Sequence, residues 1–288
     1  MRLALGTAQF GLDYGIANIE GQISQSSALE ILEYCKLIGL NTLDTAIAYG
    51  ESEQYLGNFG VTNFNVITKL PCIPEGCADI KNWIMEEVDA SISRLNAINL
   101  YGLMLHRPEQ LLGPYGEEIM SALLSLKKSG TVQKIGISVY SPDEFTELFS
   151  VYDFDIVQCP FNIIDRRLVN SGWLAKLKAL GVEVHVRSSF LQGLLLMPRD
   201  EIPDQFSPWD SLWDDWHEWL VKHTVKPVDA CIAYVLSHCN IDQVIVGVDS
   251  KIQLEQIVSA IESNNIKAFP DIGSFDSNLI NPSNWKTA

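Results

Sequence analysis

The stretches Asn65–Leu70 (NVITKL) and Asn99–His106 (NLYGLMLH) decide the fold, because both are short apolar runs with a basic side chain close to their carboxyl ends. Between them, Ala78–Leu95 carries apolar residues at four-residue spacing, which places one apolar stripe along a helix. A strand, a helix and a second strand in this order form a unit of parallel sheet with a right-handed crossover. Strands rich in Val, Ile and Leu are typical of a sheet that is buried on both faces.

The same alternation extends outward from this unit over the whole chain, with further helical patterns at Ser27–Ile38 and Ser250–Ile261. Eight strand–helix units fit a closed barrel better than an open sheet. The sequence therefore predicts an α/β fold, a single (β/α)8 TIM barrel, with residues 1–288 as one domain. The other six predicted strands are Leu3–Gly6, Asn41–Asp44, Lys134–Val139, Asp155–Cys159, Val182–Ser188 and Gln243–Val248.

Composition and charge exclude several classes of protein. Apolar residues make up 47% of the 288 residues, which is enough for a substantial core, and the formal net charge is −16. A nucleic-acid binder needs a basic face, so we expect no nucleic-acid partner. The first residues do not form a signal peptide, and no stretch approaches the roughly 18 apolar residues of a membrane span. We expect a cytoplasmic protein that does not bind membranes.

The six cysteines form no CxxC pair, and no histidine cluster has the spacing of metal ligands. We therefore expect free thiols and no metal site. Cys72 and Cys77 lie close together in one predicted loop, and a redox pair between them is the alternative interpretation.

A tryptophan-rich segment follows the seventh predicted strand and keeps helical spacing. Its aromatic stripe favours an outer helix that packs onto the barrel, and the alternative is a lid over the substrate pocket. Phe10 is a further candidate for the pocket lining. The segment contains Trp209, Leu212, Trp213, Trp216, Trp219 and Leu220.

Polar side chains lie at the carboxyl ends of the predicted strands, which form the reactive face of such barrels. Asp44, Lys69 and His106 end three successive strands. Each has a structural explanation when taken alone: a helix cap, a solvated charge and a structural histidine. Their convergence on one rim favours proton chemistry instead. The remaining strand ends contribute Thr7, Ser138, Gln158, Arg187, Ser188 and Gly247.

The residues around these positions resemble the motifs of the aldo-keto reductase family. The match comprises DTAIAYGESEQYLG at 44–57, ITK at 67–69, LHRP at 105–108 and GIS at 136–138, and it continues through QCPFN and GLL. The resemblance covers nearly the whole chain. It implies that the protein uses a nicotinamide cofactor to interconvert a small carbonyl compound and an alcohol.

The catalytic tetrad of that family maps onto Asp44, Tyr49, Lys69 and His106. The resemblance implies that Tyr49 acts as the general acid in reduction and as the general base in oxidation. Lys69, paired with Asp44, would lower the pKa of Tyr49, and His106 would orient the carbonyl. No catalytic metal is expected.

The resemblance also implies a cofactor site, from which this chain departs at some positions. Arg187 replaces an aromatic residue that commonly stacks on the nicotinamide. After the last strand, Asp249 and Gln253 fall where basic residues are common, so that only Lys251 could pair with a 2′-phosphate. We expect NADP(H), with NAD(H) as the alternative. The expected cofactor-binding residues are Thr7, Ser138, Gln158, Arg187, Ser188, Gly247, Lys251 and Gln253.

Two other functions are consistent with these residues. The first is a nicotinamide-binding regulatory or sensor subunit with little turnover. The second is a barrel lyase or isomerase in which Lys69 forms a Schiff base with its substrate. The sequence leaves the substrate, the direction of the reaction and the oligomeric state open.

Overall fold

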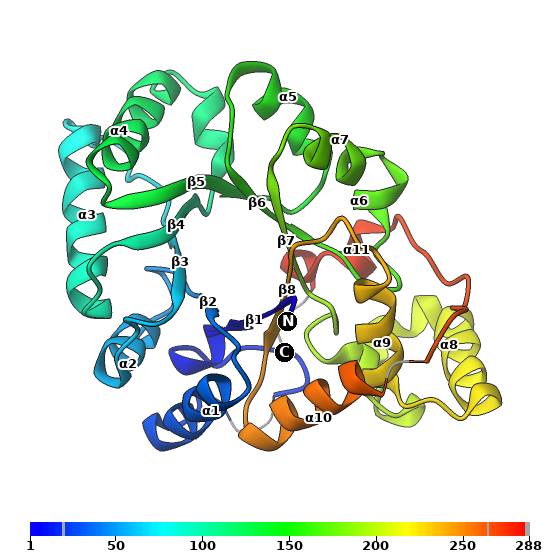
Figure 1. Ribbon diagram of the computed structural model, residues 1–288. Helices are drawn as coiled ribbons and strands as arrows, with labels where there is room; N and C mark the ends of the chain where they lie inside the picture. The colour runs from blue at the N-terminus through cyan, green and yellow to red at the C-terminus, as the bar shows by residue number, and fades with distance from the viewer. Residues whose placement is uncertain (19–20, 264, 286–288) are drawn as a thin grey trace.

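Eight parallel strands close into a barrel in the computed structural model, which describes residues 1–18, 21–263 and 265–285 (Figure 1). Each strand pairs with the next one along the chain, and β1 also pairs with β8. The predicted (β/α)8 fold is confirmed, and every predicted strand lies within two residues of the observed one at either end. A single domain over residues 1–288 stays a prediction, since residues 286–288 lie outside the described part. The strands are β1 Leu3–Gly6, β2 Thr42–Asp44, β3 Asn65–Leu70, β4 Leu100–Leu105, β5 Val132–Ser138, β6 Ile156–Pro160, β7 Glu183–Arg187 and β8 Gln243–Gly247.

Helices connect successive strands and surround the barrel (Figure 1). Figure 1 shows α8 farther from the strands than its neighbour α9. The helices are α1 Gln25–Leu37, α2 Ser52–Phe59, α3 Ile80–Leu95, α4 Gly116–Ser129, α5 Glu144–Val151, α6 Arg167–Asn170, α7 Trp173–Ala179, α8 Asp210–His223, α9 Pro227–Leu236, α10 Lys251–Glu262 and α11 Ser277–Ile280.

Local hydrogen bonds decide where these helices begin. The Ser250 side chain caps α10 by accepting from the backbone N–H of Gln253, as its position before an apolar stripe predicts. At α5 no side chain caps the helix, which begins at Glu144. The Glu144 carboxylate instead accepts the backbone N–H groups of Tyr140 (2.8 Å) and Ser141 (2.7 Å). This turn fixes the backbone directly after β5.

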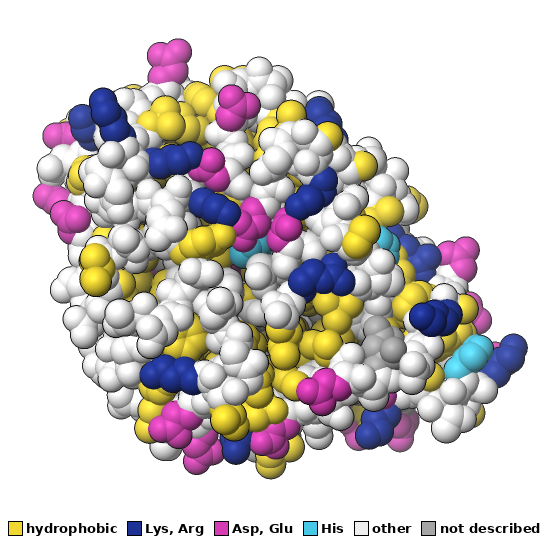
Figure 2. Space-filling view, in the orientation of Figure 1, with side chains coloured by type: hydrophobic (Ala, Val, Ile, Leu, Met, Phe, Trp, Pro, Cys, Tyr) yellow, Lys and Arg dark blue, Asp and Glu magenta, His cyan; other side chains and the backbone are white. Residues whose placement is uncertain are grey.

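The barrel interior combines a small apolar layer with a polar network near the amino ends of the strands. Ile67, Met104 and Ile156 form an apolar cluster apart from the main core. Tyr101 packs against this cluster and donates to Glu183 at 2.8 Å. Figure 2 shows basic, acidic and histidine side chains side by side near the middle of the face in view. The network contains Tyr101, Lys134, Glu183 and His185.

Candidate active site

The structure brings the four predicted catalytic side chains together at the carboxyl ends of β2, β3 and β4. The Lys69 Nζ lies 2.6 Å from Asp44 Oδ1, and it lies 5.2 Å from the centroid of the Tyr49 ring. The His106 ring meets the Tyr49 ring edge-on, with 5.9 Å between their centroids. Tyr49 therefore lies beside both a buried ammonium and an imidazole.

The Asp44–Lys69 pair is buried and its polar groups are satisfied from several strands. Lys69 also donates to the Thr45 carbonyl at 3.0 Å. The second Asp44 oxygen accepts from Gln158 Nε2 at 2.7 Å, and Ser138 donates to Gln158 Oε1 at 3.2 Å. These contacts join β2, β3, β5 and β6, so the carboxylate and the ammonium have little freedom to move.

The electrostatics of Tyr49 differ from the direction that the resemblance implies. Burial raises the pKa of the Tyr49 phenol, the Asp44 carboxylate raises it further, and Arg187 lowers it. The expected lowering by Lys69 does not appear, because the ammonium is neutralised by its contact with Asp44. The Tyr49 phenol is therefore protonated at neutral pH.

His106 is neutral at physiological pH. Burial lowers its pKa from 6.5 to about 4, and the positive charges of Lys69, Arg187 and Arg107 act in the same direction against Asp44. A neutral imidazole offers one donor and one acceptor nitrogen, so it can hydrogen-bond to a substrate oxygen without giving up a full charge.

Ser52 and Glu53 of the DTAIAYGESEQYLG stretch make hydrogen bonds that hold the segments around the site together. Ser52 donates to the hydroxyl of Thr7 at 2.8 Å, and Thr7 donates to the Asp44 carbonyl at 3.0 Å. The buried Glu53 carboxylate accepts from Thr68 at 2.7 Å, and it also accepts from Ser91 and Arg94 on α3. The sequence did not predict that Ser52 and Glu53 have these structural roles.

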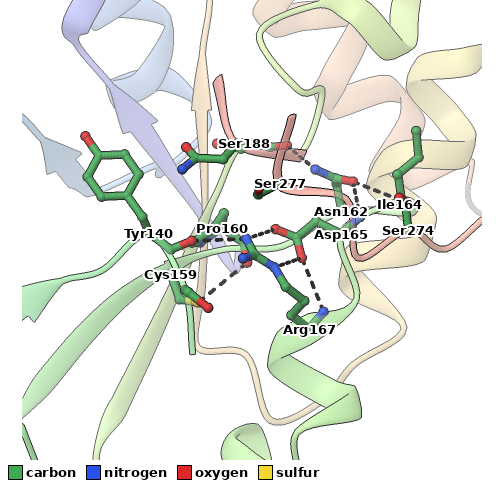
Figure 3. Close-up of polar contacts among 12 residues, drawn as sticks. Tyr140, Cys159, Pro160, Asn162, Ile164, Asp165, Arg167, Ser188, Ser274 and Ser277 are labelled. Carbon is green, nitrogen blue, oxygen red and sulfur yellow. Dashed lines mark hydrogen bonds and ion pairs between the residues drawn. The ribbon is translucent and has the colours of Figure 1, made fainter. Parts of the chain in front are cut away.

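The exits of β5, β6 and β7 are tied to one another at the rim. Arg187 donates to the Val139 carbonyl at 3.0 Å, and its guanidinium carbon lies 5.0 Å from the centroid of the Tyr140 ring. Ser188 adopts a positive φ of 64°, and its carbonyl accepts from the Asn162 amide at 3.0 Å. Figure 3 shows the Asn162 amide directed toward Ser188. Ser138, Gln158, Arg187 and Ser188 thus line one side of the barrel mouth.

An ion pair holds this rim from the outside. Arg167 contacts the Asp165 carboxylate through two nitrogens, at 2.9 and 2.8 Å, and also donates to the Tyr140 carbonyl at 3.0 Å. Figure 3 shows Arg167 reaching from its helix toward both residues. Because Asp165 is fully buried, this pair fixes the segment after β6 against the segment after β5.

The β8–α10 residues lie apart from the tetrad. Lys251 pairs with Glu255 at 3.4 Å, and its ammonium lies 5.6 Å from the centroid of the Tyr34 ring on α1. Glu30 and Glu33 of α1 line the same surface depression. Gln253 turns back and accepts from the backbone N–H of Asp249 at 2.8 Å. Gly247 leaves room for the Gln9 side chain, which would lie 2.6 Å from an added Cβ.

The residues considered for the lining of the substrate pocket do not line it, because they are buried. Phe10, Trp213 and Trp216 are fully buried, and the two indole N–H groups donate to the backbone carbonyls of Phe206 and Leu195. The burial of the aromatic stripe agrees with the packing interpretation, but the two indoles bond to the segment after β7 and not to the barrel strands. Tyr14 was not predicted for this region; it is 39% exposed and accepts a long 3.4 Å hydrogen bond from Gln192.

The segment after β7 has features that fit a polar ligand such as a nicotinamide cofactor. The buried Ser189 hydroxyl has no hydrogen-bond partner among the described residues. Ser188, Leu191 and Gln192 have positive φ values of 64°, 49° and 55°. A spare buried polar group in a strained loop is typical of a place where a ligand completes the hydrogen bonding.

Residues 1–18, 21–263 and 265–285 contain no group of three His, Cys, Asp or Glu residues suited to a metal ion. None of the helices in these ranges has the length and hydropathy to span a bilayer. All six cysteines are free thiols; Cys72 is exposed, and a redox role of Cys72 and Cys77 stays untested.

Comparisons with known proteins agree with this geometry. A model of the aldo/keto reductase family matches residues 2–269. The oxidoreductase sirO of Leptosphaeria maculans is 24% identical, over 92% of this chain and 90% of its own length. An NADH-specific methylglyoxal reductase of Escherichia coli is 24% identical, over 91% of this chain and 90% of its own length. A solved aldo-keto reductase of Bacillus halodurans in its holo form superimposes with a TM-score of 0.73 at 22% identity, covering 92% of this chain and 88% of that one.

Proposed function

This chain belongs to the aldo/keto reductase family, and we propose that it reduces an aldehyde or ketone to an alcohol, or catalyses the reverse reaction, with Tyr49 as the group that transfers the proton. The observation that supports this most directly is the position of the Tyr49 phenol beside Lys69 and His106. A carbonyl that is being reduced develops negative charge on oxygen and needs a proton donor there.

The side chains divide the chemistry between them. A bound nicotinamide cofactor supplies or accepts the hydride. Tyr49 donates its proton to the carbonyl oxygen in reduction and takes it back in oxidation. Neutral His106 hydrogen-bonds to the same oxygen and orients it. The Asp44–Lys69 pair lies beside the Tyr49 ring, with the ammonium 5.2 Å from the ring centroid, and its hydrogen bonds hold this side of the site in place.

We assign the cofactor to the rim formed by β1 and β5–β8. Ser138 and Gln158 would hold the carboxamide, because they are the buried polar pair next to Asp44. The expectation of NADP(H) comes from the family resemblance, and Lys251, the one residue that could pair with a 2′-phosphate, has Glu30, Glu33 and Glu255 around it. Such an acidic setting opposes a 2′-phosphate and favours NAD(H). Thr7, Arg187, Ser188, Gly247 and Gln253 complete the proposed cofactor site.

The lyase alternative finds little support in the geometry of Lys69. Its ammonium is fully buried and donates to both Asp44 and Thr45, so a substrate carbon could reach it only after these contacts break. Burial does lower the pKa of Lys69, which favours a nucleophilic amine, but the Asp44 carboxylate opposes that shift.

The test is the oxidation of NADH and of NADPH in the presence of a panel of small aldehydes and ketones. We expect turnover by the wild type, with the higher kcat/KM for NADH. The Tyr115→Phe variant is the control, because Tyr115 is 58% exposed and lies just before α4. Tight cofactor binding without turnover of any carbonyl would favour the sensor function instead. Borohydride trapping of a substrate adduct on Lys69 would favour the lyase.

A further inference from the structure

Two arginines at the barrel mouth differ from the other arginines of the chain. Arg94, Arg166, Arg167 and Arg199 each pair with a carboxylate, and Arg2 donates to three backbone carbonyls. Arg107 and Arg187 form no ion pair with any described residue. Of the seven arginines, Arg107 is the one whose guanidinium makes no hydrogen bond with a described residue, and Arg187 donates only to the Val139 carbonyl and the Ser188 hydroxyl.

The two guanidinium groups that form no ion pair lie against the same aromatic ring. Their carbon atoms lie 5.4 Å (Arg107) and 5.0 Å (Arg187) from the centroid of the same Tyr140 ring. Arg187 is held by its bond to the Val139 carbonyl, whereas the Arg107 guanidinium makes no hydrogen bond with a described residue. Two like charges around one ring repel each other unless an anion lies between them.

The local charge at the mouth is positive although the chain as a whole is strongly acidic. Lys69, Arg107 and Arg187 act together on His106, and Asp44 is the acidic group that opposes them. The formal net charge of the chain is −16. A positive site that persists on such an acidic protein is suited to an anionic ligand.

We propose that Arg107, assisted by Arg187, binds a carboxylate of the carbonyl substrate. This inference rests on the proposed function, because it places the substrate carbonyl at Tyr49 and His106. Arg107 directly follows His106, so a carboxylate bound there belongs to the same small molecule as the carbonyl that His106 orients. Tyr140 supports the two guanidinium groups through its ring.

The test compares 4-carboxybenzaldehyde with its neutral amide, 4-carbamoylbenzaldehyde, in the wild type and in Arg107→Gln. We expect the wild type to prefer the carboxylate, and Arg107→Gln to lower kcat/KM for the carboxylate about tenfold to a hundredfold, the range of a charge-assisted hydrogen bond. Turnover of the amide should change less than about threefold. Arg107→Lys should recover part of the preference for the carboxylate, since lysine keeps the positive charge but lacks the paired N–H donors of the guanidinium. Lys222→Gln, an exposed and unpaired cation on α8, is the control.

Three results would overturn the inference: equal turnover of both aldehydes by the wild type, equal losses for both in Arg107→Gln, or a tenfold weaker binding of NADH or NADPH in that variant. The last result would assign Arg107 to the cofactor. If neither aldehyde is reduced, the proposed function fails, and calorimetric titration with 4-carboxybenzaldehyde decides the anion site by itself. Binding that disappears in Arg107→Gln supports the site, and absence of binding to the wild type refutes it.

Discussion

A methyl group on Gly11 would lie 1.8 Å from the backbone carbonyl oxygen of Tyr49. The contact is reciprocal, because a Cβ on Gly50 would lie 2.3 Å from the Gly11 carbonyl oxygen, and Gly50 has a positive φ of 51°. The loop after β1 thus packs backbone to backbone against the segment that carries the proposed acid. Any side chain at Gly11 must displace Tyr49 or the loop.

The Gly11→Ala variant should therefore lose activity without losing its fold. Gly11 has φ −129°, which alanine adopts without strain, so the effect comes from the contact with Tyr49. We expect kcat/KM to fall by about a hundredfold, as is typical when a catalytic group moves by about 1 Å. Gly113→Ala is the matched control, with φ −87° and its nearest neighbour at 3.3 Å. Wild-type kcat/KM in Gly11→Ala would contradict the prediction.

Breaking the buried Asp44–Lys69 pair should cost stability as well as activity. In Lys69→Met the Asp44 carboxylate stays buried and loses its charged partner, so we expect the free energy of unfolding to fall by about 3–5 kcal/mol in denaturant titrations. The Asp44→Leu/Lys69→Met double variant should regain most of this stability and remain inactive. A double variant no more stable than Lys69→Met would show that the uncompensated charge is not the cause.

The pH profile of reduction should be flat between about pH 5 and pH 9. The pKa of Tyr49 is raised by burial, so the phenol keeps its proton across this range, and the pKa of His106 is lowered to about 4. Activity should fall only where His106 becomes protonated. His106→Gln should be slow and should lack this acidic limb. If activity still falls at acid pH in the His106→Gln variant, another group causes the fall.

His106 should also make the protein less stable in acid. Its pKa is about 4 in the folded chain and 6.5 in the unfolded chain, so the unfolded state takes up the proton first. The contribution of His106 to the free energy of unfolding is complete above pH 6.5 and decreases as the pH falls toward 4. The unfolding midpoint of the wild type should therefore fall relative to that of His106→Gln as the pH decreases through this interval.

The polar network at the amino ends of the strands should matter for stability and not for turnover. Burial raises the pKa of Glu183, but hydrogen bonds from His185, Lys134 and Tyr101 outweigh it and bring the value to about 2. This contribution is present above pH 4.5 and is lost as the pH falls toward 2. Glu183→Gln should lower the unfolding temperature at pH 7 and leave kcat/KM unchanged. A lower kcat at equal folded fraction would contradict the assignment of a structural role.

The sequence predicts the barrel and much of the site for a topological reason. Parallel strands bring their carboxyl ends to one face, so Asp44, Lys69 and His106 must converge once the strands are placed. Tyr49 lies in a loop, where periodicity says nothing, and its role came from the resemblance alone. The contact between Gly11 and Tyr49 also joins two loops, so periodicity does not predict it either.

Other features depend on register and on side-chain contacts that a sequence does not encode locally. Arg107 and Tyr140 follow β4 and β5, and Arg187 is the last residue of β7, so their meeting depends on how the ends of these three strands are bent. The direction of the Tyr49 pKa could not be predicted either, because it depends on burial and on the neutralisation of Lys69 by Asp44. The Lys251–Glu255 pair is the exception, since its four-residue spacing on a helix is visible in the sequence.

The measurement that tests the central claim most directly is a fluorescence titration with NADH and NADPH of the wild type and of Tyr49→Phe, followed by carbonyl turnover with both proteins. Removal of one hydroxyl leaves the proposed cofactor residues intact, so we predict that both proteins bind the cofactor with similar Kd and that only the wild type turns over. A Tyr49→Phe variant that reduces carbonyls at the wild-type rate would contradict the role of Tyr49, and a wild type that binds neither nucleotide would contradict the reductase function itself.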